Sequence, residues 1–227
     1  MGNTYRKDQR MALLQLAIDS TTIDDALQLA ESAYPFFDIA EIGTPLLIEH
    51  GLAALEALRE RYPDKQFLAD TKIADAGHLE ASSAFRRGAH FATVLGVSDD
   101  ITIRAALTAA EEYTAQIMID MIHVTDVRQR ARQLEQMGVH AICLHTAHDV
   151  QGTGTDPLTH LHDVREAVQC PLAIAGGIGL DNVQAALDMG ADIIVVGGGI
   201  ATAPDARHAA EQLKRIIQTS TGHVDTP

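Results

Sequence analysis

The sequence predicts a single (β/α)₈ barrel, and two observations carry this prediction. Eight short apolar runs recur along the 227 residues, and each is followed by a segment with the three-and-four apolar spacing of an amphipathic helix. A regular strand-then-helix alternation over about 200 to 250 residues is typical of this barrel. The chain is 46% hydrophobic, so one domain of this size can bury its core. A doubly wound parallel sheet is the alternative fold with the same alternation.

Each predicted strand is a short apolar run that ends in small or polar residues. The strands are expected at residues 13–18, 37–42, 66–72, 91–95, 116–121, 140–145, 171–175 and 192–196. Each predicted helix carries an apolar stripe between charged flanks. The helices are expected at Ile23–Ala33, Leu52–Arg61, Glu80–Arg87, Ile101–Tyr113, Val127–Met137, Leu158–Val168, Asp181–Met189 and Asp205–Ile217.

The domain prediction is a catalytic barrel over residues 13–218, with a flexible N-terminal extension over 1–12 and a flexible tail over 219–227. Neither a signal peptide nor a membrane span is expected, because the N-terminus is polar and no apolar run is long enough, so we expect a cytoplasmic protein. A net charge of −14 without a basic cluster disfavours nucleic acid and anionic membranes as partners. Cys143 and Cys170 lie in apolar runs without metal-ligand spacing and are expected to be buried free thiols.

Alternate side chains of a barrel strand point inward, so the pattern of each strand separates interior residues from residues that face the helices. The inward series are Gln15, Ala17 and Asp19 in the first strand, Ile39 and Glu41 in the second, Leu68, Asp70 and Lys72 in the third, Gln116, Met118 and Asp120 in the fifth, and Ala141, Cys143 and His145 in the sixth. The last inward position of five strands is therefore ionisable.

Ionisable side chains at the C-terminal mouth predict an active site, because burying charge is costly and barrel enzymes place their catalytic groups there. One carboxylate alone could be a helix cap or a surface ion pair, but five coincident positions favour a site. The five carboxylates of the mouth against one ammonium leave a formal charge of −4, which predicts a bound cation; these residues are Asp19, Glu41, Asp70, Asp75, Asp120 and Lys72. Oxygen ligands favour Mg²⁺ over zinc, with Mn²⁺ as a substitute.

A second group of candidates is rich in glycine. Gly176 and Gly177 follow the seventh predicted strand, and Gly197 and Gly198 follow the eighth. Glycines let backbone N–H groups close around a dianion, and the next helix N-terminus adds its dipole. Glycines also end strands for steric reasons, but the loops after strands seven and eight form the usual phosphate site of this fold. We therefore predict phosphate binding at these four glycines.

The sequence contains eleven histidines, and only His145 ends a predicted strand in register. His123 lies at the mouth and is a further candidate to touch substrate. Surface roles are expected for His50, His78, His90, His140, His148, His160, His162 and His208.

Taken together, these residues resemble the 3-hexulose-6-phosphate synthase family, over about residues 13 to 217. The motifs that carry the resemblance are Gln15-Leu-Ala-Ile-Asp19, Glu41-Ile-Gly-Thr-Pro45, Asp70-Thr-Lys-Ile-Ala-Asp75, Val94-Leu-Gly, Asp120-Met-Ile, His145-Thr, Ala175-Gly-Gly-Ile and Val196-Gly-Gly-Gly-Ile200. That family belongs with the orotidine monophosphate decarboxylase suprafamily, whose shared signature is Asp-x-Lys-x-x-Asp. Here the signature is Asp70, Lys72 and Asp75.

The resemblance implies an aldol condensation of D-ribulose 5-phosphate with formaldehyde through an enediolate stabilised by Mg²⁺. By similarity, Glu41 and Asp70 would bind the metal and Lys72 would neutralise the developing oxyanion. His145 would transfer the proton, because its ordinary pKa suits acid–base work at neutral pH.

The resemblance also assigns the remaining carboxylates. Asp19, Asp75 and Asp120 would orient sugar hydroxyls and the Lys72 ammonium. In relatives the last Asp of the signature reaches the site of the neighbouring subunit, so Asp75 implies a homodimer with shared active sites.

Three alternatives remain open. Ala74 matches 3-keto-L-gulonate-6-phosphate decarboxylase, but that family would have Glu in place of Asp120 and Arg in place of Gly198. A non-catalytic barrel that binds a sugar phosphate is the second alternative, and the complete charged set argues against it. A ribulose-phosphate epimerase is the third, but it would need several histidines at strand ends.

Overall fold

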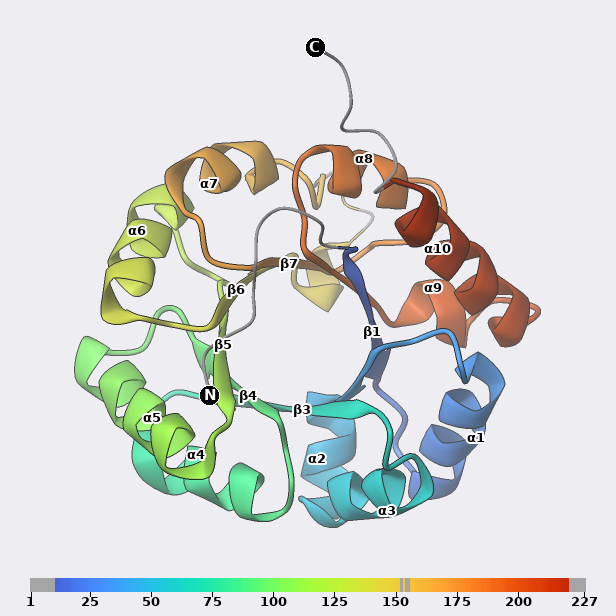
Figure 1. Cartoon of the computed structure of the whole chain (residues 1–227), viewed down its shortest axis with the longest axis horizontal. Coiled ribbons are helices and arrows are strands. Elements are labelled where there is room, and N and C mark those ends of the chain that lie inside the picture. Colours follow the sequence, from blue (N-terminus) through green and yellow to red (C-terminus); the bar gives the residue numbers. More distant parts are fainter. Residues whose placement is uncertain (1–10, 152, 154–155, 221–227) are drawn as a thin grey trace.

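The computed structural model describes residues 11–151, 153 and 156–220. Eight parallel strands close into a barrel in the order β1 to β8, and the helices form a ring around it (Figure 1). The predicted single (β/α)₈ barrel is confirmed, and a doubly wound open sheet is excluded by the closure.

The observed elements follow the predicted alternation. The strands are β1 Leu13–Ile18, β2 Ile39–Ile42, β3 Gln66–Ile73, β4 Phe91–Leu95, β5 Gln116–Asp120, β6 Ala141–His145, β7 Leu172–Ala175 and β8 Ile193–Val196. The helices are α1 Ile23–Ala33, α2 Thr44–His50, α3 Ala53–Arg61, α4 Gly77–Arg86, α5 Asp100–Tyr113, α6 Val127–Met137, α7 Leu161–Ala167, α8 Val183–Asp188, α9 Gly198–Ala201 and α10 Ala206–Ser220, and the 3₁₀ helix η1 spans His148–Val150.

Helices α2 and α9 were not predicted from the sequence. Both are too short to show a clear apolar period. Helix α2 begins directly after Gly43, and Pro45 in its first turn has the backbone angle that a helix start requires. Helix α9 comprises only four residues after β8.

The boundaries of the predicted extension and tail are only partly described. Met11 and Ala12 precede β1, and α10 continues to Ser220, so the first two residues of the predicted tail are helical. The remainder of both segments, residues 1–10 and 221–227, lies outside the described residues.

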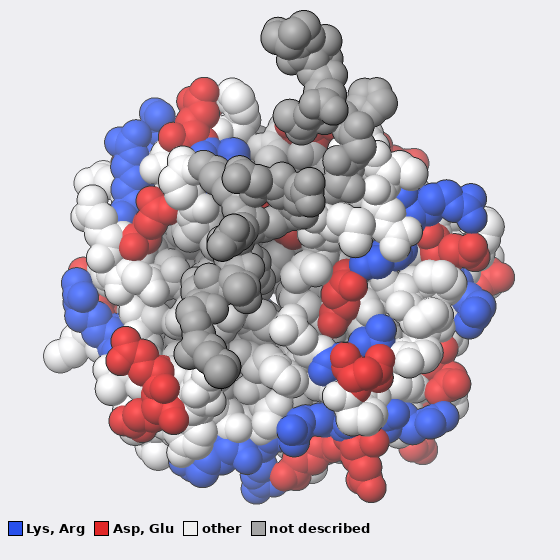
Figure 2. Space-filling model, in the orientation of Figure 1, with Lys and Arg blue, Asp and Glu red and all other residues white. Residues whose placement is uncertain are grey.

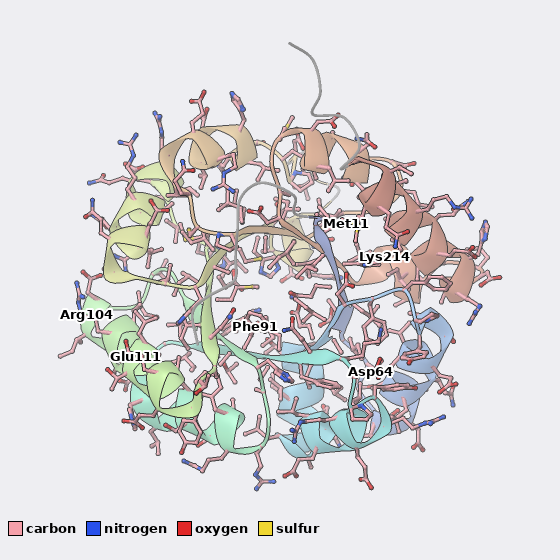
Figure 3. The ribbon with its side chains drawn as sticks, in the orientation of Figure 1. Met11, Asp64, Phe91, Arg104, Glu111 and Lys214 are labelled. Carbon is pink, nitrogen blue, oxygen red and sulfur yellow. The ribbon has the colours of Figure 1, made fainter. Side chains whose placement is uncertain are left out.

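The core has two layers that follow the predicted inward and outward series. Ala17, Ile39, Leu68, Met118 and Cys143 belong to the cluster that fills the barrel interior. The alternate residues of β1, by contrast, pack in the larger cluster between strands and helices. In Figure 3 the labelled Phe91 lies inside the ring and Lys214 lies on the outer helix α10.

The two cysteines differ in exposure. Both are free thiols, as predicted; Cys143 is buried, whereas Cys170 is only partly buried. Burial raises the pKa of both thiols, which keeps them protonated at neutral pH.

Charged side chains of both signs lie around the outer ring of helices on the face in Figure 2. Among the described residues no helix is long and apolar enough to span a membrane.

Candidate active site

The ionisable residues predicted from five strands meet at the mouth where those strands end. The parallel register places Glu41 beside Ala17 of β1, and Asp120 beside Cys143 of β6. His145 lies beside Ala175 of β7. Since each of these residues is at or near the C-terminal end of its strand, the closed barrel brings their side chains to one end.

The Lys72 ammonium lies between two buried carboxylates. Its Nζ is 2.6 Å from Asp70 Oδ2 and 3.2 Å from Asp120 Oδ2. Burial alone would lower the pKa of Lys72, but the charges of Asp70 and Asp120 outweigh burial and raise that pKa above its ordinary value. Lys72 is therefore a fixed cation at neutral pH.

A backbone irregularity in β3 helps to hold Lys72 in place. The pairing of β3 with β4 shifts between Ala69 and Ile73, and Lys72 has a left-handed backbone with φ of 45°. Such a backbone is costly for a residue with a side chain and is found where neighbouring groups enforce it. Here the Lys72 N–H donates to Thr93 Oγ1 at 2.9 Å.

Asp70 is held by three donors. Thr93 Oγ1 donates to Oδ1 at 2.9 Å, Thr44 Oγ1 donates to Oδ2 at 2.7 Å, and Lys72 Nζ donates to the same oxygen. The carboxylate is therefore fixed in orientation, and Oδ1 keeps one lone pair for a further partner.

Asp120 connects Lys72 to His145. Its Oδ2 lies 2.9 Å from His145 Nδ1, and its Oδ1 accepts the Ile122 N–H. Burial opposes ionisation of Asp120, but the hydrogen bond and charge of His145 and the charge of Lys72 lower its pKa below the ordinary value. An ionised Asp120 accepts Nδ1–H and leaves Nε2 of the imidazole as the basic nitrogen.

Glu41 lacks a comparable cation partner. Gln15 Nε2 donates to its Oε2 at 2.5 Å. Burial, followed by repulsion from Asp70, raises the pKa of Glu41 to about 8, although the Gln15 hydrogen bond and Lys72 oppose this. Removal from water and repulsion from Asp70 also raise the pKa of Asp19.

The raised pKa of Glu41, to which repulsion from Asp70 contributes, fits a divalent cation near these two carboxylates, since a cation would relieve that repulsion. Among the described residues, no group of three or more His, Cys, Asp or Glu is placed to hold a metal ion. A cation at these two carboxylates would therefore need water and substrate oxygens as its other ligands. Mg²⁺ is usually bound in this way, through one or two carboxylates.

Glycines make room around Asp19. A Cβ atom at Gly43 would lie 2.1 Å from Asp19 Oδ1, and one at Gly197 would lie 3.3 Å from Oδ2. The absence of side chains at these positions lets the carboxylate lie between the ends of β2 and β8. Sequence reasoning assigned Gly197 to phosphate binding and gave Gly43 no role.

The glycines after β7 and β8 differ in the space around them. Gly176 and Gly177 have left-handed backbones, with φ of 87° and 78°, and a Cβ atom at Gly176 would meet Thr146 O at 2.0 Å. Gly198 begins α9, and no atom would lie within 4 Å of a Cβ atom there. The N–H groups of Gly198 and Gly199 have no carbonyl partner within α9, whereas those of Ile200 and Ala201 donate to Gly197 O.

Asp75 stands apart from the other predicted site residues. Its side chain is exposed and accepts the N–H of the neighbouring Ala76 at 2.6 Å. In the described part of the chain, no hydrogen bond or ion pair joins it to Lys72.

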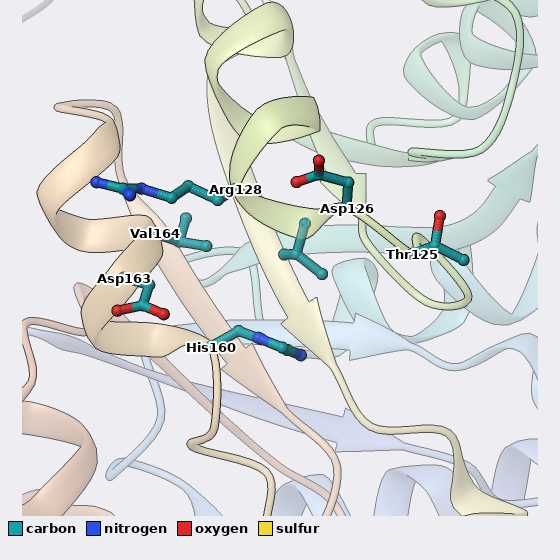
Figure 4. Close-up of a pocket in the computed structure, with 7 residues that line it drawn as sticks. Thr125, Asp126, Arg128, His160, Asp163 and Val164 are labelled. Carbon is teal, nitrogen blue, oxygen red and sulfur yellow. The ribbon is translucent and has the colours of Figure 1, made fainter.

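His123 is exposed and has a left-handed backbone with φ of 62°. It borders a surface hollow of about 620 Å³ between the β4–α5 and β5–α6 loops, which Arg130 and Asp99 also line. A second hollow, of about 380 Å³, lies between α6 and α7. It is lined by Thr125, Asp126, Val127, Arg128, His160, Asp163 and Val164, which Figure 4 draws as sticks. Neither hollow is lined by Lys72, Asp120 or His145.

Sequence reasoning missed Thr44 and Thr93, which fix Asp70. Thr93 occupies the inward series of β4, so a polar residue among apolar ones was a signal that could have found it. Thr44 belongs to the unpredicted helix α2, and its contact with Asp70 could not be read from spacing.

The chain is similar to known proteins over most of its length. The model of the Orotidine 5'-phosphate decarboxylase / HUMPS family matches residues 12–213, and the chain belongs to this family. A 3-hexulose-6-phosphate synthase from Bacillus subtilis (strain 168) is 39% identical over 90% of this chain and 98% of its own length. The chain is an enzyme, a carbon–carbon lyase with relatives of the 3-hexulose-6-phosphate synthase class.

Two solved structures extend the comparison. 3-Hexulose-6-phosphate synthase from Salmonella typhimurium has a TM-score of 0.89 and 37% identity, over 92% of this chain and 99% of that one. KGPDC from Streptococcus mutans has a TM-score of 0.86 and 26% identity over the same shares of the two chains.

The raised pKa of Glu41 predicts how stability depends on pH in the metal-free protein. The folded state holds the Glu41 proton up to pH about 8, whereas the unfolded chain releases it near pH 4.5. The free energy of unfolding therefore falls as the pH rises through this window. Glu41→Gln removes this loss, so in chelator it should melt above wild type at pH 8 and the difference should shrink toward pH 4.5. Each kcal/mol relieved should raise Tm by about 2–4 °C.

The matched control is Glu49→Gln at an exposed position of α2. Calorimetry of the three proteins across pH measures the effect. A Tm difference between Glu41→Gln and wild type that stays constant from pH 4.5 to 8 would contradict the electrostatic account.

Proposed function

We propose that this enzyme joins D-ribulose 5-phosphate to formaldehyde in a metal-dependent aldol condensation that gives D-arabino-hex-3-ulose 6-phosphate. The observation that carries the proposal is the chain of contacts from Asp70 through Lys72 and Asp120 to His145. It places a permanent cation beside a base at the mouth of the barrel. The identity of nearly 40% with 3-hexulose-6-phosphate synthases supports the same reaction.

The phosphate end of the substrate fits the loops after β7 and β8. Gly177 and Gly198 leave space for a dianion, because no atom lies closer than 3.9 Å to a Cβ position at either residue. Gly176 and Gly197 let the backbone pass close to Thr146 and Asp19, and the first two N–H groups of α9 have no carbonyl partner within the helix. The pentulose phosphate of the proposed reaction carries such a dianion at the end of its carbon chain. Phosphate bound there would direct the sugar carbons toward His145 and Lys72.

The protein's own residues then divide the chemistry. His145 Nε2 takes the proton from C1 of the pentulose phosphate, and Asp120 stabilises the imidazolium that forms. Lys72 lies beside the oxygen that gains charge and stabilises the enediolate. A divalent cation, Mg²⁺ or Mn²⁺, would be held by Glu41 and Asp70 and would supply further stabilisation of negative charge on the sugar oxygens. Asp19 is placed to accept hydrogen bonds from sugar hydroxyls.

The second candidate function is that of a 3-keto-L-gulonate-6-phosphate decarboxylase (KGPDC), since KGPDC from Streptococcus mutans shares the fold and is 26% identical in sequence. The higher identity to synthases, and Asp at position 120, favour the aldolase.

The proposed function is tested by comparing two efficiencies of the purified protein with Mg²⁺. Formaldehyde consumption with D-ribulose 5-phosphate should exceed CO₂ release from 3-keto-L-gulonate 6-phosphate, and chelation should abolish it. His145→Ala should slow exchange of the C1 proton in heavy water by about 10²–10⁴-fold, because it removes the base. The exposed His208→Ala is the control. If CO₂ release is the more efficient reaction, the protein is a decarboxylase. If the purified protein shows neither activity, the non-catalytic barrel that binds a sugar phosphate becomes the preferred interpretation.

We also propose that the active enzyme is a homodimer in which Asp75 completes the site of the neighbouring subunit. Asp75 has no partner at its own site among the described residues, although it belongs to the signature with Lys72. Leu79 in α4, Val97 in the β4–α5 loop and Ile101 in α5 are 65%, 56% and 78% exposed, as expected of an apolar surface that a second copy covers.

Mixing inactive Asp75→Asn with inactive Lys72→Ala should therefore restore activity. In a hybrid dimer one of the two sites has both native residues, so random exchange should recover about a quarter of wild-type activity. Subunit exchange followed by the formaldehyde assay measures this recovery, with each variant incubated alone as the control. An active monomer in sedimentation would refute the shared site.

A further inference from the structure

Gln15 is a buried amide in the apolar interior of the barrel. It lies on the inner face of β1, 1% exposed, between Ile39 of β2 and Val195 of β8 in the register. Its inward neighbours Ala17, Ile39 and Val195 are all apolar. Burying an amide there is unfavourable unless its polar atoms are bonded.

The bonding of Gln15 is one-sided. Its Nε2 donates to Glu41 Oε2 at 2.5 Å, but its Oε1 is buried without a hydrogen-bond partner in the described part of the chain. Buried polar atoms in folded proteins are nearly always hydrogen-bonded, so the unbonded Oε1 needs an explanation. A functional role for the Nε2 group, which bonds Glu41, would explain why the amide is retained.

The orientation of the Glu41 carboxylate depends on a single donor, Gln15, whereas three donors fix the orientation of Asp70. Asp70 has Thr44, Thr93 and Lys72. Glu41 accepts a hydrogen bond only from Gln15 within the described residues. The amide occupies Oε2 and restricts rotation of the carboxylate, so Oε1 of Glu41 remains available.

We propose that Gln15 is a positioning residue that orients Glu41 to bind the divalent cation. This proposal rests on the proposed function, because it assigns a partner to one of the two carboxylates that would hold the metal. Residues that hydrogen-bond a metal-binding carboxylate change metal affinity by about 10–100-fold when they are removed.

Gln15→Met tests the proposal, because methionine is similar in length and shape but has no N–H group. Binding of Mn²⁺ to the full chain, followed by electron paramagnetic resonance, should weaken by about 10–100-fold. In chelator, Gln15→Met removes the unbonded Oε1 but also leaves Glu41 Oε2 without its donor, so Tm is measured beside the Mn²⁺ affinity to separate a change in stability from a change in metal binding. Ile193→Val, a change without a polar atom in the same interior cluster, is the matched control and should bind Mn²⁺ as wild type does.

The outcomes separate this inference from the proposed function. Unchanged Mn²⁺ affinity in Gln15→Met, with normal binding in wild type, overturns the role of Gln15 alone. A lower Tm with unchanged affinity assigns Gln15 to structure only. Absence of Mn²⁺ binding by wild type removes the metal site itself, and the proposed function with it.

A second, independent observation concerns the opposite end of the barrel, where the strands begin. The residue just before each even-numbered strand makes two hydrogen bonds with one residue of the preceding strand. Its side chain accepts the backbone N–H of that partner residue, and its own backbone N–H donates to the partner's carbonyl oxygen. We call these four arrangements strand clamps. They are Asp38 with Leu14 at 2.8 Å, His90 with Phe67 at 3.0 Å, His140 with Ile117 at 3.1 Å and Asp192 with Leu172 at 2.8 Å.

The four strand clamps differ in chemistry. The two carboxylate clamps also bind a cation: Asp38 pairs with Lys214, and Asp192 pairs with Arg165. In the other two, Nδ1 of a histidine is the acceptor, which only the neutral ring can be. Two of the histidines expected to have ordinary surface roles thus also hold β3 and β5.

We further infer that His90 and His140 make the barrel acid-sensitive at β3 and β5. Protonation of Nδ1 would turn the acceptor into a donor that faces the strand N–H, and the clamp would open. These two strands carry Asp70, Lys72 and Asp120, so opening would loosen the central ion pairs of the site.

The surroundings of both rings favour the neutral form in the folded protein. Burial and the nearby charge of Arg59 on α3 lower the pKa of His90, whose ring also stacks on Phe67. Burial lowers the pKa of His140, against the opposing charge of Glu111 on α5. A lowered pKa means that the unfolded chain binds more protons, so stability is complete above pH about 6.5 and falls as the pH drops below it.

Amide hydrogen exchange of wild type at pH 7 and pH 5 tests this directly. After correction for the intrinsic pH dependence, protection of Phe67 and Ile117 should fall at pH 5, while Leu14 and Leu172 in the carboxylate clamps serve as internal controls. Parallel changes at all four amides would refute the inference.

The double variant His90→Asn/His140→Asn gives a second measurement, because the Asn side-chain oxygen can accept the N–H but does not titrate. Its Tm should fall less than that of wild type between pH 7 and pH 5. His162→Asn/His208→Asn, at exposed positions, is the control and should behave as wild type does. An equal fall in Tm for the His90/His140 variant and wild type would also refute the inference.

Discussion

The ion pairs of Lys72 with Asp70 and Asp120 are the interaction on which the rest of the site depends. Two carboxylates removed from water would repel each other without this ammonium, and the ammonium itself would lose its charge if it were buried alone. The left-handed backbone at Lys72 and the shift in the β3–β4 register bring the three groups together. Through Asp120, the same contacts fix the orientation of His145.

Charge and rigidity are distributed unequally over the mouth. Asp70 and Asp120 are held by several donors and are matched with cations, whereas Glu41 and Asp19 have raised pKa values and fewer partners. The group of Asp70, Asp120 and Lys72, in which charges are paired, is preorganised for a charge that develops during reaction. Glu41 and Asp19, which have fewer partners, are suited to a ligand that brings its own positive charge or hydroxyl groups.

The departures from the decarboxylase pattern have a structural meaning. Asp120, shorter than Glu by one methylene, contacts Lys72 and His145 through a single oxygen. Gly198 leaves open space at the start of α9, because no atom lies within 4 Å of a Cβ position there.

The sequence by itself determined the barrel and the residues at its mouth. The alternation of apolar runs and amphipathic helices depends only on local periodicity, and the inward series of each strand follows from the pleat, so Asp70, Lys72, Asp120 and His145 could be assigned to one end of the barrel. Tertiary structure alone decided which groups touch. Thr44, Thr93 and Gln15 act across strands that are distant in sequence, and His90 and His140 accept N–H groups more than twenty residues away. No spacing rule predicts such contacts, because they arise from the closure and stagger of the barrel, which bring these groups within hydrogen-bond distance.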